Sequence, residues 1–284
     1  MRAVATRADG AVNSPVTVMP PRRERARRVV LSGQTARILA PIAGLAAVLA
    51  LLQLAVAAFH IPKYILPPPS DFLPAIVTDW NQLWPATVVT AEEVVYGFLL
   101  GTVFSIPLAL VLSSIRPIRD TLYPLIVFFQ VIPKIAIAPL MIIWFGAGKM
   151  SVTLLTFALC FFPILINSMA GFSQLDPRRL YITKSMGASR WQTFRYLRVQ
   201  SALPYMFAGF RVASTLAVTG VIVGQFVGSA AGLGYLLEAS TGILNTALVF
   251  ADVVVLSVLG LLVNYIVVAA EALCMPWQRR KATA

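Results

Sequence analysis

The chain has 284 residues, of which 58% are hydrophobic and only 12% are charged. An average soluble domain carries about 25% charged residues, so this composition excludes an ordinary soluble enzyme, a disordered chain, a coiled coil and a collagen-like chain. Lys and Arg outnumber Asp and Glu by 23 to 11, and the two cysteines are too few for a disulfide framework. The composition indicates a membrane protein with a surplus of positive charge.

Six stretches are apolar enough to cross a bilayer core of about 30 Å, which takes about 20 helical residues each. Each holds at most one charged residue, and none shows the alternation of a barrel strand. The stretches are residues 38–59, 94–115, 121–148, 150–175, 203–228 and 253–270. We therefore predict an all-α membrane protein with six transmembrane helices.

The positions of Lys and Arg predict the orientation of these helices. If there are six, 20 of the 23 basic residues fall on one side of the membrane. Eight lie before residue 38, two in the turn 116–119, seven in the stretch 178–211 and three in the tail. Because basic residues accumulate on the cytoplasmic side, we expect both termini to be cytoplasmic.

The charge pattern also divides the chain into three parts. Residues 1–37 form a basic arm, which we expect to be disordered, and residues 278–284 form a cytoplasmic tail. Residues 38–277 form the transmembrane domain. The arm suits a tail held near anionic lipid by its arginines, and a partner-binding role is the alternative.

The outer connection after the first span contains three consecutive prolines, residues 67–69, which favour an extended chain. Ser70 or Asp71 is placed to cap a short helix after them. The apolar residues that follow suit an amphipathic helix at the membrane interface: Phe72, Leu73, Ile76, Trp80, Leu83 and Trp84. This segment is either a membrane-surface spacer or a docking platform for an external partner.

The third span contains Pro133 and Pro139, which kink helices, and Lys134 between them. A lysine in mid-membrane costs about 2.5–3.5 kcal/mol on insertion scales, so Lys134 should face the protein interior or a water-filled path. It contacts either an anionic or hydrogen-bonding solute, or backbone carbonyls that the prolines leave free. Polar residues inside the spans form the candidate translocation path, with helix packing as the alternative: Gln130, Lys134, Asn167, Ser168 and Gln225.

The loop of about residues 173–204 predicts two short amphipathic helices on the cytoplasmic face. Asp176-Pro177 is typical of a helix start, and Gly187 can end that helix with a positive φ. Ser189 and Gln192 have the spacing of a capping box for a second helix, and Pro204 marks the passage into the fifth span. Such a shape suits insertion into a groove on another protein, or a lipid surface.

At this loop the chain resembles the membrane-spanning permease subunits of ATP-binding cassette (ABC) importers. Gly187 matches the glycine of their cytoplasmic signature, although Tyr181-Ile182-Thr183 replaces Glu-Ala-Ala and the Leu203-Pro204 pair stands four residues late. The resemblance covers about residues 66–277, to the branch that imports taurine, alkanesulfonates, nitrate, bicarbonate, pyrimidine precursors or riboflavin. Gln225 stands where that branch commonly has glutamate. Four segments carry the likeness: residues 131–148, 161–172, 185–213 and 224–240.

The resemblance implies a type I ABC importer permease fold in a bacterial inner (cytoplasmic) membrane, with multiple passes. It implies a homodimer or paired permease, two cytoplasmic ATPase subunits that bind ATP and Mg, and an extracytoplasmic solute-binding protein. The solute would be small and polar or heterocyclic. This chain would itself have no catalytic residue, cofactor, metal or nucleic acid partner, and membrane lipid would surround it.

The resemblance also makes the loop of residues 173–204 the coupling loop, which docks on the ATPase. The residues expected to carry that contact are Tyr181, Lys184, Ser185, Met186, Gly187, Ala188, Ser189, Arg190 and Arg195.

Two other classes of protein are the alternatives. A secondary transporter, or another polytopic protein without an ATPase partner, would show internal repeats and intramembrane carboxylates, whereas Asp252 is expected at a helix end. A membrane enzyme would need a reactive cluster, and the only histidine is His60. The adjacent Glu92 and Glu93 are expected to mark the outer edge of the second span.

Overall fold

The computed structural model of the chain describes residues 33–174 and 177–276. These residues belong to two units, one ending at Val48 and the other beginning at Leu49. The boundary lies inside the first helix. Most of the predicted arm and the whole predicted tail lie outside the described residues.

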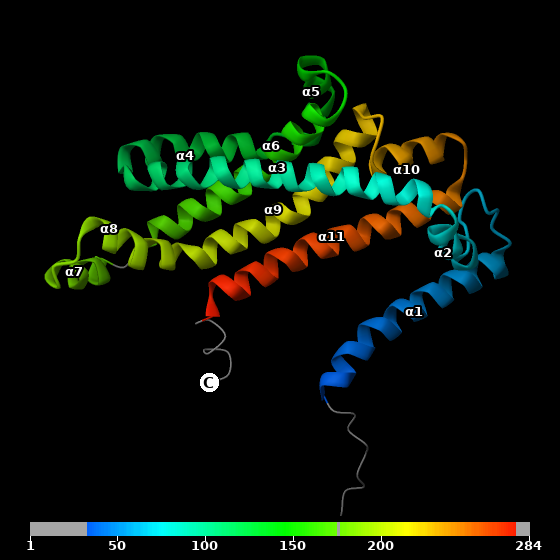
Figure 1. The fold of residues 1–284 in the computed structure, drawn as a ribbon, viewed down its shortest axis with the longest axis horizontal. Helices are drawn as coiled ribbons and strands as arrows, with labels where there is room; N and C mark the ends of the chain where they lie inside the picture. The colour runs from blue at the N-terminus through cyan, green and yellow to red at the C-terminus, as the bar shows by residue number, and fades with distance from the viewer. Residues whose placement is uncertain (1–32, 175–176, 277–284) are drawn as a thin grey trace, which may run out of the picture. The chain divides into compact units, whose positions relative to one another are not determined.

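Within the described ranges the regular structure is entirely helical (Figure 1). The elements are α1 (Gly33–Phe59), α2 (Pro69–Thr78), α3 (Trp80–Ser114), α4 (Arg116–Val131), the 3-10 turn η1 (Lys134–Ile137), α5 (Ala138–Phe145), α6 (Lys149–Ser173), α7 (Pro177–Ser185), α8 (Arg190–Gln192), the π segment η2 (Thr193–Arg198), α9 (Val199–Gly228), α10 (Leu233–Gly242) and α11 (Thr246–Cys274).

The predicted spans are found as five long apolar helices and one bent pair. The five are α1, α3, α6, α11 and the continuous helix of residues 190–228. The third predicted span is the bent pair, in which α4 and the η1–α5 segment meet at 76°. Counted as one crossing, the pair brings the number of spans in the described residues to six, as predicted.

The bend in the third span is sharper than the kink expected from the sequence, and its cause is local. Ile132 precedes Pro133 and has an extended ψ of 129°, as the proline ring demands of the residue before it. Pro133 also has no N–H to continue the hydrogen bonds of α4. The helix therefore ends at Val131, and η1 restarts the chain in a new direction.

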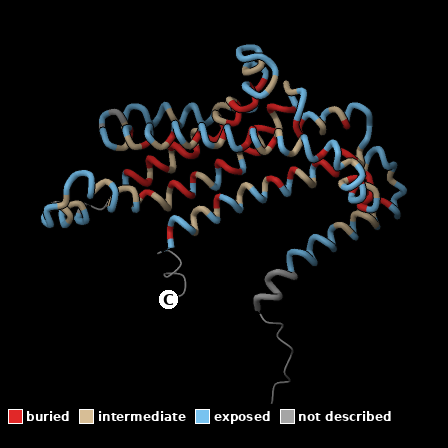
Figure 2. Tube along the Cα trace, in the orientation of Figure 1, coloured by how far each residue is buried: buried red, intermediate tan, exposed pale blue. Residues whose placement is uncertain are grey.

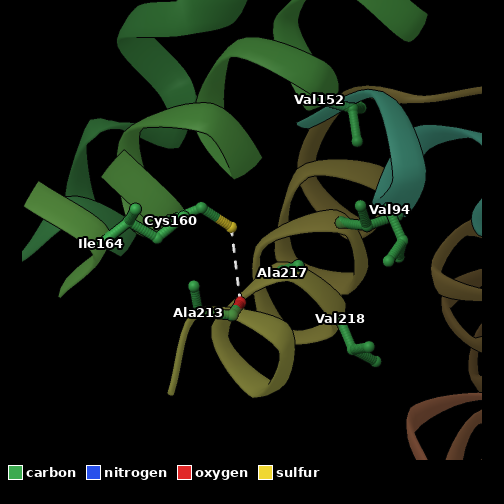
Figure 3. Packing of buried hydrophobic residues seen from close by; sticks show 8 residues of the cluster. Val94, Val152, Cys160, Ile164, Ala213, Ala217 and Val218 are labelled. Atoms are coloured by element: carbon green, nitrogen blue, oxygen red, sulfur yellow. Dashed lines mark hydrogen bonds between the residues drawn. The ribbon is translucent and has the colours of Figure 1, made fainter. Parts of the chain in front are cut away.

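The core of residues 49–276 is built around α6, which packs against α3 and against α9. Figure 2 shows the buried residues along these facing helices, and Figure 3 shows one cluster of them, including Cys160, whose thiol donates to the Ala213 carbonyl. Glycines let the helices approach closely. A Cβ on Gly101 of α3 would stand 2.9 Å from the Cβ of Cys160, and one on Gly220 of α9 would stand 3.1 Å from the Thr156 Cα.

The connection between α1 and α3 departs from its prediction. Neither Ser70 nor Asp71 caps α2, because the helix already begins at Pro69, with Pro68 as its N-cap. The Asp71 carboxylate instead forms an ion pair with the Lys63 ammonium group at 2.8 Å. The hydrogen bond from Lys63 lowers the pKa of the Asp71 carboxyl group. The expected interfacial helix is also split, since α2 ends at Thr78 and Trp80 opens α3.

The coupling loop is also organised differently from the prediction. Its second helix does not stop at Pro204, because α8, η2 and α9 follow one another without a break from Arg190 to Gly228. Pro204 lies inside α9. The coupling loop therefore consists of one short helix, a turn and the first turns of the fifth span.

The prediction that Asp252 stands at a helix end is wrong because α11 is longer than expected, and α3 is longer than expected as well. The helix α11 begins at Thr246, so Asp252 lies in its second turn, fully buried, and not at the helix end. The helix α3 begins at Trp80, so Glu93 lies well inside it and is 1% exposed, whereas Glu92 is about half exposed.

The close packing of α6 and α9 can be tested with a matched pair of glycine variants. Gly220→Ala adds a methyl group against the α6 backbone, and we expect it to lower the free energy of unfolding by about 1–3 kcal/mol relative to Gly260→Ala. A Cβ on Gly260 would meet only Val218, at an ordinary 3.8 Å. Both variants gain the same helix propensity, so thermal unfolding in detergent isolates the steric effect. Equal unfolding temperatures for the two variants would contradict this packing.

Candidate functional site

The turn of the coupling loop is fixed by a C-terminal cap on α7. The Ala188 N–H donates to the Thr183 carbonyl at 3.1 Å, and Gly187 has a φ of +74°. This 6→1 bond around a left-handed glycine is the Schellman arrangement. No atom would lie within 4 Å of a Cβ on Gly187, so its backbone conformation, and not crowding, favours glycine there.

A capping box starts the helix on the other side of the turn, as predicted. The Gln192 N–H donates to Ser189 Oγ at 3.2 Å, and the Ser189 N–H donates to Gln192 Oε1 at 2.8 Å. The two caps fix both ends of a three-residue turn, 186–188. The turn is thereby held by hydrogen bonds on both of its sides.

The predicted contact residues lie together on this turn and the helices beside it. Met186 is 79% exposed and Tyr181 is 75% exposed, as large apolar side chains rarely are unless they meet a partner or lipid. Arg190 is exposed, and the Arg195 guanidinium lies over the Tyr196 ring. The side chain of Lys184 lies outside the described residues. A cavity of about 490 Å³ opens between the two arms of the loop, lined by Thr183, Met186, Gly187, Ala188, Gln192, Thr193, Tyr196 and Leu197.

The base of the coupling loop is tied to the membrane core. The Tyr205 hydroxyl of α9 donates to Gln174 Oε1 just after α6. One turn earlier in α6, a Cβ on Gly171 would stand 2.9 Å from the Ala202 carbonyl oxygen. These contacts join the two helices that enter and leave the coupling loop.

Two of the predicted path residues line a common cavity. Gln130 and Lys134 border a space of about 280 Å³ beside the break in the third span, together with Pro133, Ile135, Leu159, Pro163 and Leu216. The Lys134 ammonium donates to the Gln130 carbonyl at 2.9 Å and lies 4.9 Å from the centre of the Phe162 ring. Lys134 thus satisfies a carbonyl at the end of α4 while it borders the cavity.

The other two path candidates on α6 lie deeper in the structure. Asn167 donates to the Pro163 carbonyl at 2.8 Å and is partly buried. Ser168 is fully buried, and its hydroxyl has no hydrogen-bond partner within the described residues. Neither residue borders the cavity around Lys134.

Gln225 belongs to a buried polar cluster that the sequence analysis missed. It is 1% exposed, and its Nε2 donates to Glu93 Oε2 at 2.6 Å. Its Oε1 accepts from the Gly234 N–H at 2.9 Å and from the Thr90 hydroxyl at 3.0 Å. Thr90 in turn accepts from the Leu233 N–H at 2.8 Å. The helical spacing of Thr90 and Glu93 was the available signal, since residues three apart share a helix face.

The described residues contain no group of three or more His, Cys, Asp or Glu side chains that could hold a metal ion.

The sequence matches the family described as binding-protein-dependent transport system inner membrane component over residues 97–273. The chain is 33% identical over 221 residues to the riboflavin transport system permease protein RibX of Chloroflexus aurantiacus, covering 76% of this chain and 82% of RibX.

Two further relatives are transport permeases. The chain is 32% identical to the formylaminopyrimidine transport permease protein ThiX of Halalkalibacterium halodurans, covering 77% of this chain and 88% of the relative. It is 25% identical to the taurine transport system permease protein TauC of Escherichia coli, covering 76% of this chain and 82% of TauC.

The family match extends over the coupling loop, the bent third span and Gln225, whereas Thr90 and Glu93 of the buried cluster lie before it. Together with the membrane-spanning helices these matches confirm the predicted family and the predicted location in a bacterial inner membrane. The chain belongs to the binding-protein-dependent transport system inner membrane components, the permease subunits of ABC importers, with the type I fold.

Proposed function

We propose that two copies of this permease, or one copy and a related subunit, form the path for a small polar or heterocyclic solute. Two cytoplasmic ATPase subunits would bind ATP and Mg and drive the transport. A solute-binding protein would deliver the solute on the other side. Membership of the family supports an ATPase and a binding protein as partners in general, and the solutes named for the relatives support the class of solute.

The observation that carries the ATPase contact is the coupling-loop turn. Its backbone is fixed by caps on both sides, while Met186 and Tyr181 are largely exposed. Arg190 and Arg195 add positive charge beside these apolar side chains, which suits an acidic rim around an apolar groove. We propose that the other predicted contacts, Lys184, Ser185, Gly187, Ala188 and Ser189, complete this surface.

The placement of the termini is part of the same proposal. With the coupling loop in the cytoplasm, the basic arm of residues 1–37 and the tail of residues 278–284 are cytoplasmic as well, on either side of the permease domain of residues 38–277. The arginines of the arm would hold it near anionic lipid.

For the path, we propose that the cavity at the break in the third span contacts the solute. Lys134 uses one donor for the Gln130 carbonyl, and an ammonium group has three, so two remain for a solute. Asn167 and Ser168 lie on α6, the helix that also lines this cavity through Leu159 and Pro163. The geometry of Gln225 supports a role in holding helices together, and we do not include it in the path.

The coupling contact is tested by two substitutions at the same residue. We expect Gly187→Val to weaken ATPase binding by about ten-fold, because a left-handed conformation costs an L-residue about 1–2 kcal/mol. Gly187→Asn should bind nearly as well as the wild type, since asparagine tolerates that conformation. The measurement is co-purification of the co-expressed ATPase with the tagged permease. Undiminished binding by Gly187→Val would oppose the assignment.

The path is tested by Lys134→Met and Lys134→Arg. We expect Lys134→Met to reduce uptake or apparent affinity by about ten-fold, because it removes one charge-assisted contact, and Lys134→Arg to retain most of both. Uptake is measured in cells that express the complete transporter, with riboflavin, taurine and formylaminopyrimidine as the first solutes. Transport by Lys134→Met at the wild-type rate and apparent affinity would refute a solute contact.

A further inference from the structure

The start of α10 is capped by side chains from two other helices. The N-cap residue of α10 is Gly232, which has no side chain to satisfy the N–H groups of the first turn. The Leu233 N–H donates instead to Thr90 of α3, and the Gly234 N–H donates to Gln225 of α9. Unpaired N–H groups are costly in a membrane, so these two acceptors anchor α10 where it begins.

The contact between α10 and the end of α9 is also sterically tight. A Cβ on Gly234 would stand 2.6 Å from the Ile222 carbonyl oxygen and 2.8 Å from the Gln225 Cβ. With 10 residues, α10 is about 15 Å long and too short to cross the bilayer core. These contacts hold its first turn, and Leu233 and Leu237 also pack in an apolar cluster with α11.

Glu93 fixes the side chain that makes this anchor. Its carboxylate accepts from Gln225 Nε2, so the Gln225 oxygen is turned toward Gly234 and Thr90. The charged neighbour Lys149 pairs with Glu92 at 2.6 Å, and among the described residues Glu93 accepts its hydrogen bond from Gln225. A hydrogen bond to a buried carboxylate is stronger than one between neutral groups.

This anchor lies at the far end of the helix that begins in the coupling loop. The helix of residues 190–228 has 39 residues, which corresponds to a length of about 58 Å. Arg190 belongs to the coupling loop, and Gln225 lies in the last turn of the same helix. In Figure 1, α7 and α8 lie at one end of this helix and α10 at the other.

We infer that Glu93 and Gln225 are a positioning pair for transport, which transmits movement of α9 to α10. When the ATPase moves the coupling loop, the pair makes α10 and the neighbouring part of α3 follow the end of α9. The inference rests on the proposed function, since it requires that the ATPase acts on the coupling loop. Neither residue needs to touch the solute.

The test exchanges the two side chains. Gln225→Glu removes the amide that donates to Glu93 and places two carboxyl groups side by side, whereas the double variant Glu93→Gln/Gln225→Glu restores an amide–carboxyl pair in the reverse direction. A glutamate at position 225 can still accept from the Gly234 N–H and the Thr90 hydroxyl. Glu93→Gln keeps a neutral hydrogen bond to Gln225 and should be the milder single change.

The measurement is ATP hydrolysis by the permease with its ATPase subunits in lipid nanodiscs, without the binding protein. We expect Gln225→Glu to raise this basal rate by at least about five-fold, and the double variant to return it to within about two-fold of the wild type. A merely structural defect would lower the amount of assembled complex without changing the rate per complex. Glu92→Gln, which removes the adjacent carboxylate outside the pair, is the control and should leave the rate unchanged.

Two results would overturn the inference. One is a basal ATP hydrolysis rate in Gln225→Glu equal to that of the wild type. The other is a double variant whose basal rate is as high as that of Gln225→Glu. If Gln225→Glu does not assemble with the ATPase, the double variant becomes the test. A genuine pair predicts that the double variant assembles and hydrolyses ATP at the wild-type basal rate. Failure of the proposed function would look different, since the wild-type permease would then bind no ATPase.

Discussion

A backbone group in lipid has no water to bond, so every helix end within the membrane-spanning part needs a partner from the protein. Two such helix ends lie inside this fold: the end of α4 and the start of α10. At the end of α4, the ammonium group of Lys134 donates to the Gln130 carbonyl. At the start of α10, the side chains of Thr90 and Gln225 accept from the first N–H groups. Lys134, Thr90 and Gln225 thus satisfy helix ends, and both ends lie beside the features assigned to transport.

Between these two helix ends, α3, α6 and α9 pack closely, as the transmission of movement through the protein requires. Glycines on α3 and α9 bring both helices against α6 at distances that leave no room for a methyl group. The helix that leaves the coupling loop continues without a break to Gln225. A displacement at the coupling loop therefore has a continuous, closely packed route to α10, and the buried Glu93–Gln225 pair is the last link in it.

Local patterns in the sequence predicted much of this structure. Apolar stretches predicted the spans, and Ser189, Gln192 and Gly187 predicted the caps of the coupling loop, because each of these signals depends on near neighbours. Predictions failed where a helix extends further than expected: Pro204 is accommodated inside α9, and Asp252 lies inside a helix that begins earlier than hydropathy indicates. The Glu93–Gln225 pair joins residues 132 positions apart, which no local pattern can reveal.

The central claim is that the turn at Gly187 is the surface on which the ATPase acts. It is tested most directly by a photo-crosslinking amino acid placed at Met186, with Ile243, which is similarly exposed at the α10 end, as the control position. In cells that co-express the ATPase, this account predicts a crosslink to the ATPase from position 186 and none from position 243. A crosslink from position 243 alone, or from neither position in an assembled transporter, would contradict it.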